Sequence, residues 1–285
     1  MRVASAVSAA DSFLGLRRSL GRPLIMGIVN ATPDSFYAGG RAPSPEEAVA
    51  LGERLAREGA DILDVGGEST RPGSDPVPVS VERDRVVGVV RALAARTGLP
   101  VSVDTRNAEV ASAALEAGAV ILNDVCALRN LGMSEIAVRF PLVVMMHMLG
   151  DSPRTMQNDP RYDDPIAEIG AFLRERIDAF ERAGGSIGRV WIDPGLGFGK
   201  TAEHNLQIMR GLESFAAIAP VLIGASRKSF LGKLLGSEQF PVPAEERLEG
   251  SLAAACRAAQ AGAVCVRVHD AAATRRALDS WRALS

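Results

Sequence analysis

Three side chains spread along the chain, Asp104, Asn123 and Asp193, are of types that bind the edge of a flat nitrogen heterocycle. A carboxylate accepts two parallel N–H bonds from an aminopyrimidine edge, and burial strengthens such charge-assisted hydrogen bonds. Each of the three ends a short apolar run, so apolar neighbours are expected. The alternative is structural, because Asp104-Thr105 and Asn123-Asp124 are also suited to cap the helices that follow them.

Cationic side chains form a second set, made of Arg71, Lys228, Arg267 and His269. Together with Asn30 they are suited to hold a diphosphate, whose charge a metal ion such as Mg²⁺ would partly screen. Arg267 and His269 are two residues apart, so they share one face of a strand. The histidines lack the spacing of zinc ligands, and a zinc site is therefore not expected.

Two further segments resemble phosphate-binding turns. Ser226-Arg227-Lys228-Ser229 begins a predicted helix, whose free N–H groups and hydroxyls would bind a carboxylate or phosphate; ordinary N-capping by Ser226 is the alternative. The segment Gly195–Thr201 reads GLGFGKT, but the first glycine of a GxxxxGK[ST] phosphate loop would fall on Pro194. A tight turn is predicted there, and nucleotide hydrolysis is not.

The segment Val29–Phe36 follows the apolar run Leu24–Ile28 and places an uncharged amide, Asn30, at the end of a predicted strand. Pro33 and Asp34 favour a turn, and Gly39-Gly40 allow the chain to reverse. An amide at a strand's end beside a polar loop is typical of barrel enzymes.

The elements that would position these residues are regular. Apolar runs without strict alternation, as expected for parallel strands covered on both sides, occur at Leu24–Asn30, Asp61–Gly66, Pro100–Asp104, Val120–Asp124, Leu142–Met148, Arg189–Asp193, Val221–Ser226 and Val264–His269. Helix-like stretches between them include Pro45–Glu58, Ser80–Arg96, Asn107–Glu116, Ile166–Arg182 and Ala244–Ala261. Several of these end in a glycine, the usual helix stop.

Eight strand–helix units in about 250 residues predict a single (β/α)8 TIM barrel. An open doubly wound sheet is the alternative, but it would need a glycine-rich turn after its first strand, where Asn30-Ala31-Thr32-Pro33 stands instead. We expect residues 1–23 to be a lead-in, poorly ordered or packing under the barrel, and residues 24–285 to form the barrel domain. Nearly every strand ends in a polar residue, and a barrel would bring these to one rim.

Composition excludes several classes of protein. The chain has 285 residues, 47% of them hydrophobic, and a net charge of −2, so no nucleic-acid-binding surface is indicated. The cysteines, Cys126, Cys256 and Cys265, form no CxxC pair and stand in apolar surroundings, which indicates buried thiols in a reducing compartment. No convincing signal peptide or membrane span is present, and a cytoplasmic location is expected.

Taken together, the motifs resemble those of dihydropteroate synthases, in the pterin-binding TIM-barrel family, along nearly the whole chain from about Leu24. They are GIVNATPDSF (Gly27–Phe36), DVGGESTRPG (Asp64–Gly73), SVDT (Ser102–Thr105), ND (Asn123-Asp124), MHM (Met146–Met148), DPGLGFGK (Asp193–Lys200), SRKSFLG (Ser226–Gly232) and RVHD (Arg267–Asp270). Methyltetrahydrofolate methyltransferases share part of this set but are not expected to carry STRPG and SRKS.

The resemblance implies condensation of 6-hydroxymethyl-7,8-dihydropterin diphosphate with 4-aminobenzoate in folate biosynthesis, Mg²⁺-dependent and SN1-like, by a homodimer. It implies that Asp104, Asn123, Met148, Asp193 and Lys228 bind the pterin, and that Asn30, as the Mg²⁺ ligand, acts with Thr70, Arg71, Arg267 and His269 on the diphosphate. It implies that Phe36, Thr70, Pro72, Phe198 and Ser229 bind 4-aminobenzoate. The catalytic set would be Arg71, Lys228, Arg267 and His269.

One segment departs from the family pattern. Many members have Ser-Asp-Gly-Gly after the loop phenylalanine, whereas this chain has Tyr37-Ala38-Gly39-Gly40. The acid thought to help order the closed loops around Mg²⁺ and diphosphate is thus replaced by Ala38. A non-catalytic or repurposed pterin-binding paralogue is therefore the alternative function.

Overall fold

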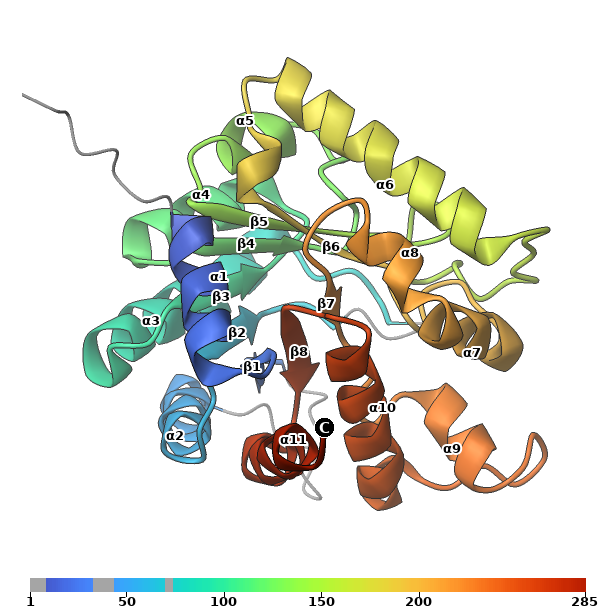
Figure 1. Ribbon diagram of the computed structural model, residues 1–285. Helices are drawn as coiled ribbons and strands as arrows, with labels where there is room; N and C mark the ends of the chain where they lie inside the picture. Colours follow the sequence, from blue (N-terminus) through green and yellow to red (C-terminus); the bar gives the residue numbers. More distant parts are fainter. Residues whose placement is uncertain (1–8, 33–43, 70–73) are drawn as a thin grey trace, which may run out of the picture.

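The computed structural model describes residues 9–32, 44–69 and 74–285 (Figure 1). Four predicted site residues, Phe36, Thr70, Arg71 and Pro72, lie outside the described residues, as does Ala38. In the described part, the strands are β1 (Leu24–Asn30), β2 (Ile62–Gly66), β3 (Val101–Asp104), β4 (Ile121–Asp124), β5 (Leu142–Met146), β6 (Val190–Asp193), β7 (Leu222–Ile223) and β8 (Cys265–Val268).

The strands form one parallel sheet in the order β6-β5-β4-β3-β2-β1-β8-β7. A parallel bridge between Ile192 and Val221, and a 2.9 Å hydrogen bond from the Ile192 N–H to the Pro220 carbonyl, join β6 to the chain entering β7. The sheet therefore closes on itself, and the predicted (β/α)8 TIM barrel is confirmed. The register aligns Asn30 with Gly66, and Asp104 with both Gly66 and Asn123, so the strand ends meet at one rim.

The helices surround the sheet (Figure 1). They are α1 (Ala9–Leu20), α2 (Pro45–Arg57), α3 (Val79–Thr97), α4 (Ala108–Ala117), α5 (Met133–Ala137), α6 (Pro165–Arg182), α7 (Ala202–Arg210), α8 (Leu212–Ala216), α9 (Ser229–Leu235), α10 (Leu248–Gln260) and α11 (Ala271–Leu284). Two short 3₁₀ helices span Ile187–Arg189 and Ala244–Glu246.

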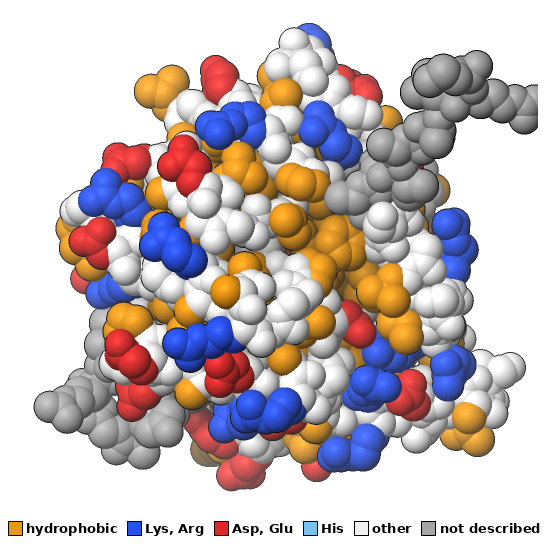
Figure 2. Space-filling view, turned by 90° about the vertical axis from the view of Figure 1, so that its left-hand side faces the viewer, with side chains coloured by type: hydrophobic (Ala, Val, Ile, Leu, Met, Phe, Trp, Pro, Cys, Tyr) orange, Lys and Arg blue, Asp and Glu red, His pale blue; other side chains and the backbone are white. Residues whose placement is uncertain are grey.

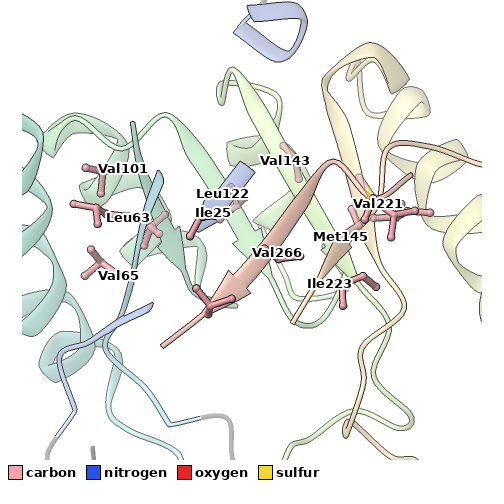
Figure 3. Packing of buried hydrophobic residues seen from close by; sticks show 14 of the residues in the cluster. Ile25, Leu63, Val65, Val101, Leu122, Val143, Met145, Val221, Ile223 and Val266 are labelled. Atoms are coloured by element: carbon pink, nitrogen blue, oxygen red, sulfur yellow. The ribbon is translucent and has the colours of Figure 1, made fainter. Parts of the chain in front are cut away.

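Alternate strand residues face opposite sides of the sheet, and this alternation divides the core. Residues on the outer face, such as Leu63, Val65 and Val266, pack with the helices in a large apolar cluster (Figure 3). The residues between them point into the barrel. In β2 the inward positions are Ile62 and Asp64, so a carboxylate stands directly above an apolar layer.

Helix α1 packs at the end of the barrel where the strands begin. Phe13 of α1 contacts Trp191 edge-on, with ring centroids 5.8 Å apart, and belongs to an apolar cluster with Leu24 and Leu142 at their strand starts. The chemistry predicted for the strand ends is therefore at the opposite end of the barrel from α1.

Some predicted boundaries are wrong. The predicted strand Leu142–Met148 ends at Met146, and the run Val221–Ser226 is a strand only at Leu222–Ile223. The helix predicted to begin at Ser226 begins at Ser229, because Arg227 adopts a left-handed φ of 59° that no helix continues. The predicted helix Ala244–Ala261 is interrupted at Arg247, between a 3₁₀ turn and α10.

The surface carries charges of both signs. On the face shown in Figure 2, acidic and basic side chains are interspersed rather than gathered by sign, in keeping with the net charge of −2. No helix in the described part of the chain is both long and apolar enough to cross a membrane. The three thiols are free; Cys126 and Cys265 are buried as predicted, and Cys256 is only partly buried.

Candidate active site

A cavity of about 460 Å³ opens where the strands end. Seven predicted site residues line it together: Asn30, Asp104, Phe198, Lys228, Ser229, Arg267 and His269. They come from β1, β3, β8 and the segments that follow β6, β7 and β8, so the barrel brings together residues up to 239 positions apart, from Asn30 to His269. Glu68, Met156 and Arg247 also line the cavity.

Arg267 is held between two carboxylates. Its Nε donates to Asp64 Oδ2 at 2.6 Å, and its Nη2 donates to Asp104 Oδ2 at 2.7 Å. The Nδ2 group of Asn123 donates to the same Asp64 oxygen at 3.2 Å. This bond fixes the amide orientation and leaves Asn123 Oδ1 as an acceptor for a ligand N–H.

Burial and charge shift the pKa values of this cluster. Burial raises the pKa of Asp104 to about 7, although Arg267 opposes the shift. For Arg267, burial favours the neutral form, but Asp64 and Asp104 outweigh it and raise the pKa above its ordinary value. Arg267 therefore stays cationic, while Asp104 titrates near neutral pH.

Asp193 and Lys228 form a second charged group. Asp193 Oδ1 accepts the Gly195 N–H at 2.7 Å, and burial raises the pKa of the carboxyl. Lys228 Nζ donates to the Leu196 carbonyl and lies 4.7 Å from the centroid of the Phe198 ring. Burial lowers the pKa of Lys228 to about 8, against the attraction of Asp193.

Three predicted pterin residues do not line the cavity: Asn123, Met148 and Asp193. They are 5%, 1% and 5% exposed. Met148 packs with Met146, Met156 and the Phe198 ring in a small apolar cluster next to the cavity. Met156, which the sequence analysis did not single out, lines the cavity where Met148 was expected.

The capping alternatives are now decided. Asp104 binds Arg267, but Thr105 Oγ1 accepts the Asn107 N–H at 3.1 Å just before α4, whose N-cap residue, Asn107, makes no side-chain capping bond. Asp124 does stabilise the turn after β4, because its carboxylate accepts the N–H groups of Cys126 and Leu128 at 2.8 and 2.7 Å. Ser226 does not cap α9; its hydroxyl instead accepts the His269 N–H at 3.2 Å.

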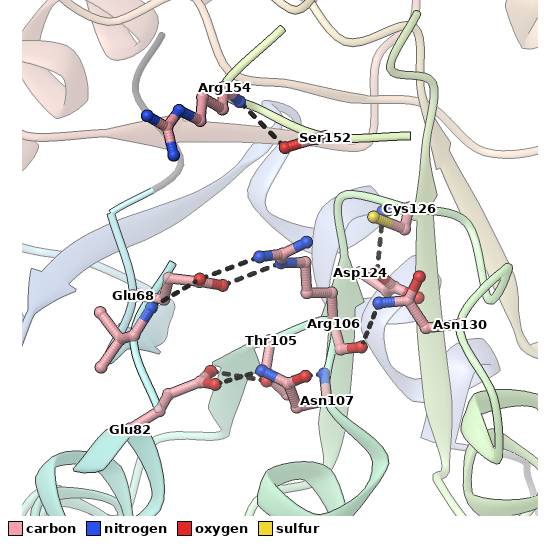
Figure 4. A network of polar contacts seen from close by, with 11 residues as sticks. Glu68, Glu82, Thr105, Arg106, Asn107, Asp124, Cys126, Asn130, Ser152 and Arg154 are labelled. Carbon is pink, nitrogen blue, oxygen red and sulfur yellow. Dashed lines mark hydrogen bonds and ion pairs between the residues drawn. The ribbon is translucent and has the colours of Figure 1, made fainter. Parts of the chain in front are cut away.

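A polar network fixes the segment after β2 (Figure 4). The guanidinium of Arg106 donates to both oxygens of Glu68, at 2.9 and 3.0 Å, and Asn130 Nδ2 donates to the Arg106 carbonyl. Thr105 Oγ1 donates to Glu82, whose pKa burial raises. Glu68 lines the cavity, but its carboxylate is held in an ion pair with Arg106.

The sequence analysis missed Asp64 as a site residue. The signal was its place in the middle of β2, two residues after the inward-facing Ile62, which puts a carboxylate inside the barrel. It is fully buried, and its Oδ1 has no hydrogen-bond partner among the described residues.

The cavity fits a Mg²⁺ ion only if the protein supplies part of its coordination shell and the diphosphate and water supply the rest. The described residues contain no group of three or more His, Cys, Asp or Glu side chains that could hold a metal ion. Asn30, partly exposed in the cavity wall, offers one amide oxygen. Mg²⁺ often takes one or two protein oxygens and completes its shell with phosphates and water, so this donor set fits a diphosphate-bound ion.

Comparison with known proteins agrees with the barrel and its rim. The family model described as pterin binding enzyme matches residues 26–269, so the chain belongs to the pterin-binding enzyme family. Within that family, the chain is 44% identical over 266 residues to the dihydropteroate synthase of Escherichia coli K12, covering 93% of this chain and 92% of the relative. It is likewise 44% identical over 271 residues to the enzyme of Neisseria meningitidis serogroup C, covering 93% and 94%.

Solved structures give the same result. The Xanthomonas albilineans dihydropteroate synthase with 4-aminobenzoic acid matches with a TM-score of 0.85 and 50% identity, covering 92% of this chain and 93% of that one. The same enzyme in complex with 7,8-dihydropteroate matches with a TM-score of 0.81 and 47% identity, covering 92% and 94%.

Proposed function

We propose that this chain is a dihydropteroate synthase, which condenses 6-hydroxymethyl-7,8-dihydropterin diphosphate with 4-aminobenzoate to give 7,8-dihydropteroate and diphosphate. The observation that carries the proposal is the single cavity shared by Asp104, Lys228 and Arg267 with Phe198 and Ser229. Relatives that share most of the chain carry this name, and one of them was solved with 7,8-dihydropteroate.

The pterin would be bound at the inner part of the cavity. Asp104, Asn123 and Asp193 supply acceptors for its N–H groups, and Lys228 supplies a donor. The hydrogen bond from Asn123 Nδ2 to Asp64 supports this role, because it leaves the amide oxygen Oδ1 as the acceptor. Met148, with Met156, would be the apolar wall.

The diphosphate would lie at the rim, against Arg267, His269 and Asn30, with Thr70 and Arg71 added from outside the described residues. A bound Mg²⁺ would supply charge neutralisation for the departing oxygens, with Asn30 as its protein ligand. The cationic state of Arg267 at all relevant pH values supports its place beside a leaving group.

The second substrate, 4-aminobenzoate, would lie against the Phe198 ring and Ser229, which line the outer cavity. Phe36, Thr70 and Pro72 would complete this pocket. An aromatic amine is a weak nucleophile, so the reaction gains most from a more electrophilic carbon. Diphosphate leaves first, the electron-rich pterin stabilises the resulting methylene cation, and the amine then attacks.

The chain's own groups fit this SN1-like order. Catalysis here rests on charge stabilisation of the leaving group and on exclusion of water. The thiol nearest the site, Cys126, has a pKa that burial raises to about 12, so it is no nucleophile at neutral pH.

The direct test is incubation of the purified protein with both substrates and Mg²⁺, followed by detection of dihydropteroate and diphosphate. Formation of both at equal rates supports the proposal. Tight pterin binding without product would favour the non-catalytic paralogue, for which the replacement of the loop acid by Ala38 is the motivating observation.

The variant Ala38→Asp tests whether the missing loop acid limits catalysis. If the family acid orders the closed loops, restoring it should raise turnover of the wild-type chain by about tenfold, a gain of 1.4 kcal/mol in transition-state binding. Unchanged turnover would mean that the acid is dispensable here. The measurement is kcat at saturating concentrations of both substrates.

We also propose a cytoplasmic homodimer. The resemblance supports the dimer, and the family's small-molecule substrates agree with a site in the cytoplasm. Ala254, Ala255, Ala258 and Ala259 of α10 are buried within the chain, so these side chains would not form the dimer interface. Light scattering of the purified protein would measure the oligomeric state.

A further inference from the structure

Lys200 is a buried lysine that the proposed chemistry does not use. It is 4% exposed and is the last residue of the segment Gly195–Lys200, here called the glycine loop. Its Nζ is 2.9 Å from His147 Nδ1, donates to the Phe198 carbonyl at 3.0 Å, and lies 5.9 Å from the Tyr162 ring centroid. The nitrogen thus has two hydrogen-bond partners, and burial lowers the pKa of Lys200 well below its ordinary value, against the attraction of Asp193.

The glycine loop has a backbone shape that side chains must hold in place. Gly195, Gly197 and Gly199 all have left-handed φ values of 68° to 81°. Beyond Lys200, the loop is fixed by Tyr162, whose hydroxyl donates to the Gly199 carbonyl at 3.0 Å, and by Asn205, whose Oδ1 accepts the Gly197 N–H at 2.7 Å.

The opposite side of the glycine loop faces the active site. The Leu196 carbonyl accepts a bond from Lys228 Nζ, and the Phe198 ring lies under the same ammonium. Lys228 and Phe198 are the residues assigned to the pterin and to 4-aminobenzoate. A shift of the loop would therefore displace contacts to both substrates at once.

We propose that Lys200 and His147 form a positioning pair that holds the glycine loop, and through it Phe198 and Lys228, in the geometry the reaction needs. The inference rests on the proposed function. His147 serves as an acceptor in its neutral form; burial, with Lys200 and Arg129 nearby, lowers its pKa to about 2. Neither Lys200 nor His147 lines the active-site cavity, so the pair would act through the loop.

The first test replaces Lys200 by methionine, which keeps the length of the stem and removes the donors. We expect kcat/KM for dihydropteroate formation to fall at least tenfold. The matched control is Arg22→Met, which removes a cation that is 3% exposed and bound to Asp61 at 2.7 Å, at the other end of the barrel. Arg22→Met should lower Tm but keep kcat/KM within twofold of wild type.

The second test uses the partner. His147→Asn keeps an acceptor near the place of Nδ1, whereas His147→Leu removes it. We expect the leucine variant to lose activity like Lys200→Met, the asparagine variant to recover most of it, and Lys200→Met to cost little more in the His147→Leu background. A role limited to fold stability would lower Tm in these variants but leave kcat/KM of the folded protein unchanged.

Hydrogen exchange of the amides at 196–199 supplies a readout independent of turnover. Exchange should be faster in Lys200→Met than in wild type, and unchanged in Arg22→Met. Unchanged exchange, or wild-type kcat/KM in Lys200→Met, would overturn the inference. Wild-type protein that forms no dihydropteroate would instead overturn the proposed function, and hydrogen exchange alone would then decide whether the pair holds the loop.

Discussion

At the scale of single residues, the site is organised by one shared cation. Arg267 bonds to Asp64 and Asp104 in a place where a lone buried carboxylate would be costly. Asp64 is fully buried, and Arg267 is its only ion-pair partner among the described residues. The same guanidinium thus offsets the charge of both acids, and in the proposed reaction it would also contact the departing diphosphate.

Arg267→Ala should lower turnover by about 10²-fold or more, because it removes charge stabilisation of the leaving group. It should also lower the free energy of unfolding by about 3–5 kcal/mol, because Asp64 is left buried without its cation. Single-turnover kinetics and urea denaturation measure the two effects. As a control, Arg83→Ala removes an exposed ion pair with Glu109 and should cost about 1 kcal/mol or less. A near-wild-type rate in Arg267→Ala would contradict the assignment.

The pKa shifts predict how pterin binding depends on pH. In the proposed site, Asp104 accepts the pterin N–H bonds as a carboxylate. Its pKa is about 7, so affinity should rise severalfold from pH 6 to pH 8, although the pKa of Lys228, about 8, reduces the gain near pH 8. Above pH 8, Lys228 loses its proton and affinity should fall. Calorimetric titration across this range measures the effect.

Below pH 7, the contribution of Asp104 to the free energy of unfolding should change with pH in the direction opposite to the pterin affinity. Because the folded pKa of Asp104 exceeds the unfolded value of 3.8, the native state binds more protons between pH 4 and 7, and this group's contribution to stability falls as pH rises. Asp104→Asn should flatten both the binding and the stability dependence. A pterin affinity that is constant from pH 6 to pH 8 in the wild type would contradict the prediction.

At the scale of elements, the repeated strand–helix units could be predicted from the sequence, whereas a local feature such as the start of α9 could not. Strand positions such as Leu24–Asn30 followed from continuous apolar runs, and the convergence of Asn30, Asp104 and Arg267 followed from barrel closure. The start of α9 did not, because it depends on a left-handed Arg227 that its ion pair with Asp270 and its N–H bond to Ser251 help to hold. Asp64 could have been found from its inward position in β2, two residues after Ile62, whereas Lys200 stands in a loop without such periodicity, and only three-dimensional contacts show that it is buried.

The glycine loop gives a prediction at this scale. A Cβ at Gly195 would lie 1.9 Å from the carbonyl oxygen of His147, the residue after β5, so Gly195→Ala must displace the loop from His147. We expect a loss of about 3 kcal/mol or more in stability together with a large loss of activity. Gly98→Ala is the control, because its left-handed φ of 66° is similar but its Cβ would meet nothing within 4 Å.

Gly98→Ala should cost only about 1–2 kcal/mol, the price of a left-handed alanine. The difference between the two variants in urea denaturation measures the steric part. Equal losses would mean that backbone conformation, not close packing against His147, is what requires glycine at position 195.

At the scale of the whole molecule, an apolar layer and the charged cluster lie at opposite ends of one barrel. The strand starts are filled by an apolar layer that includes Trp191 and is covered by α1, whereas the strand ends carry the charged cluster. Changes at the α1 end should therefore alter folding without altering the reaction, provided that the barrel stays closed.

Phe13→Ala tests this separation. Phe13 is 7% exposed and contacts Trp191 edge-on, so its removal should lower the free energy of unfolding by about 2–4 kcal/mol. Leu16 of the same helix is 40% exposed, so Leu16→Ala should lower the free energy of unfolding by less than about 1 kcal/mol. Below the unfolding transition, both variants should keep wild-type kcat/KM, since the active-site cavity lies at the other end of the barrel. A fall in kcat/KM in fully folded Phe13→Ala would show that the two ends are coupled.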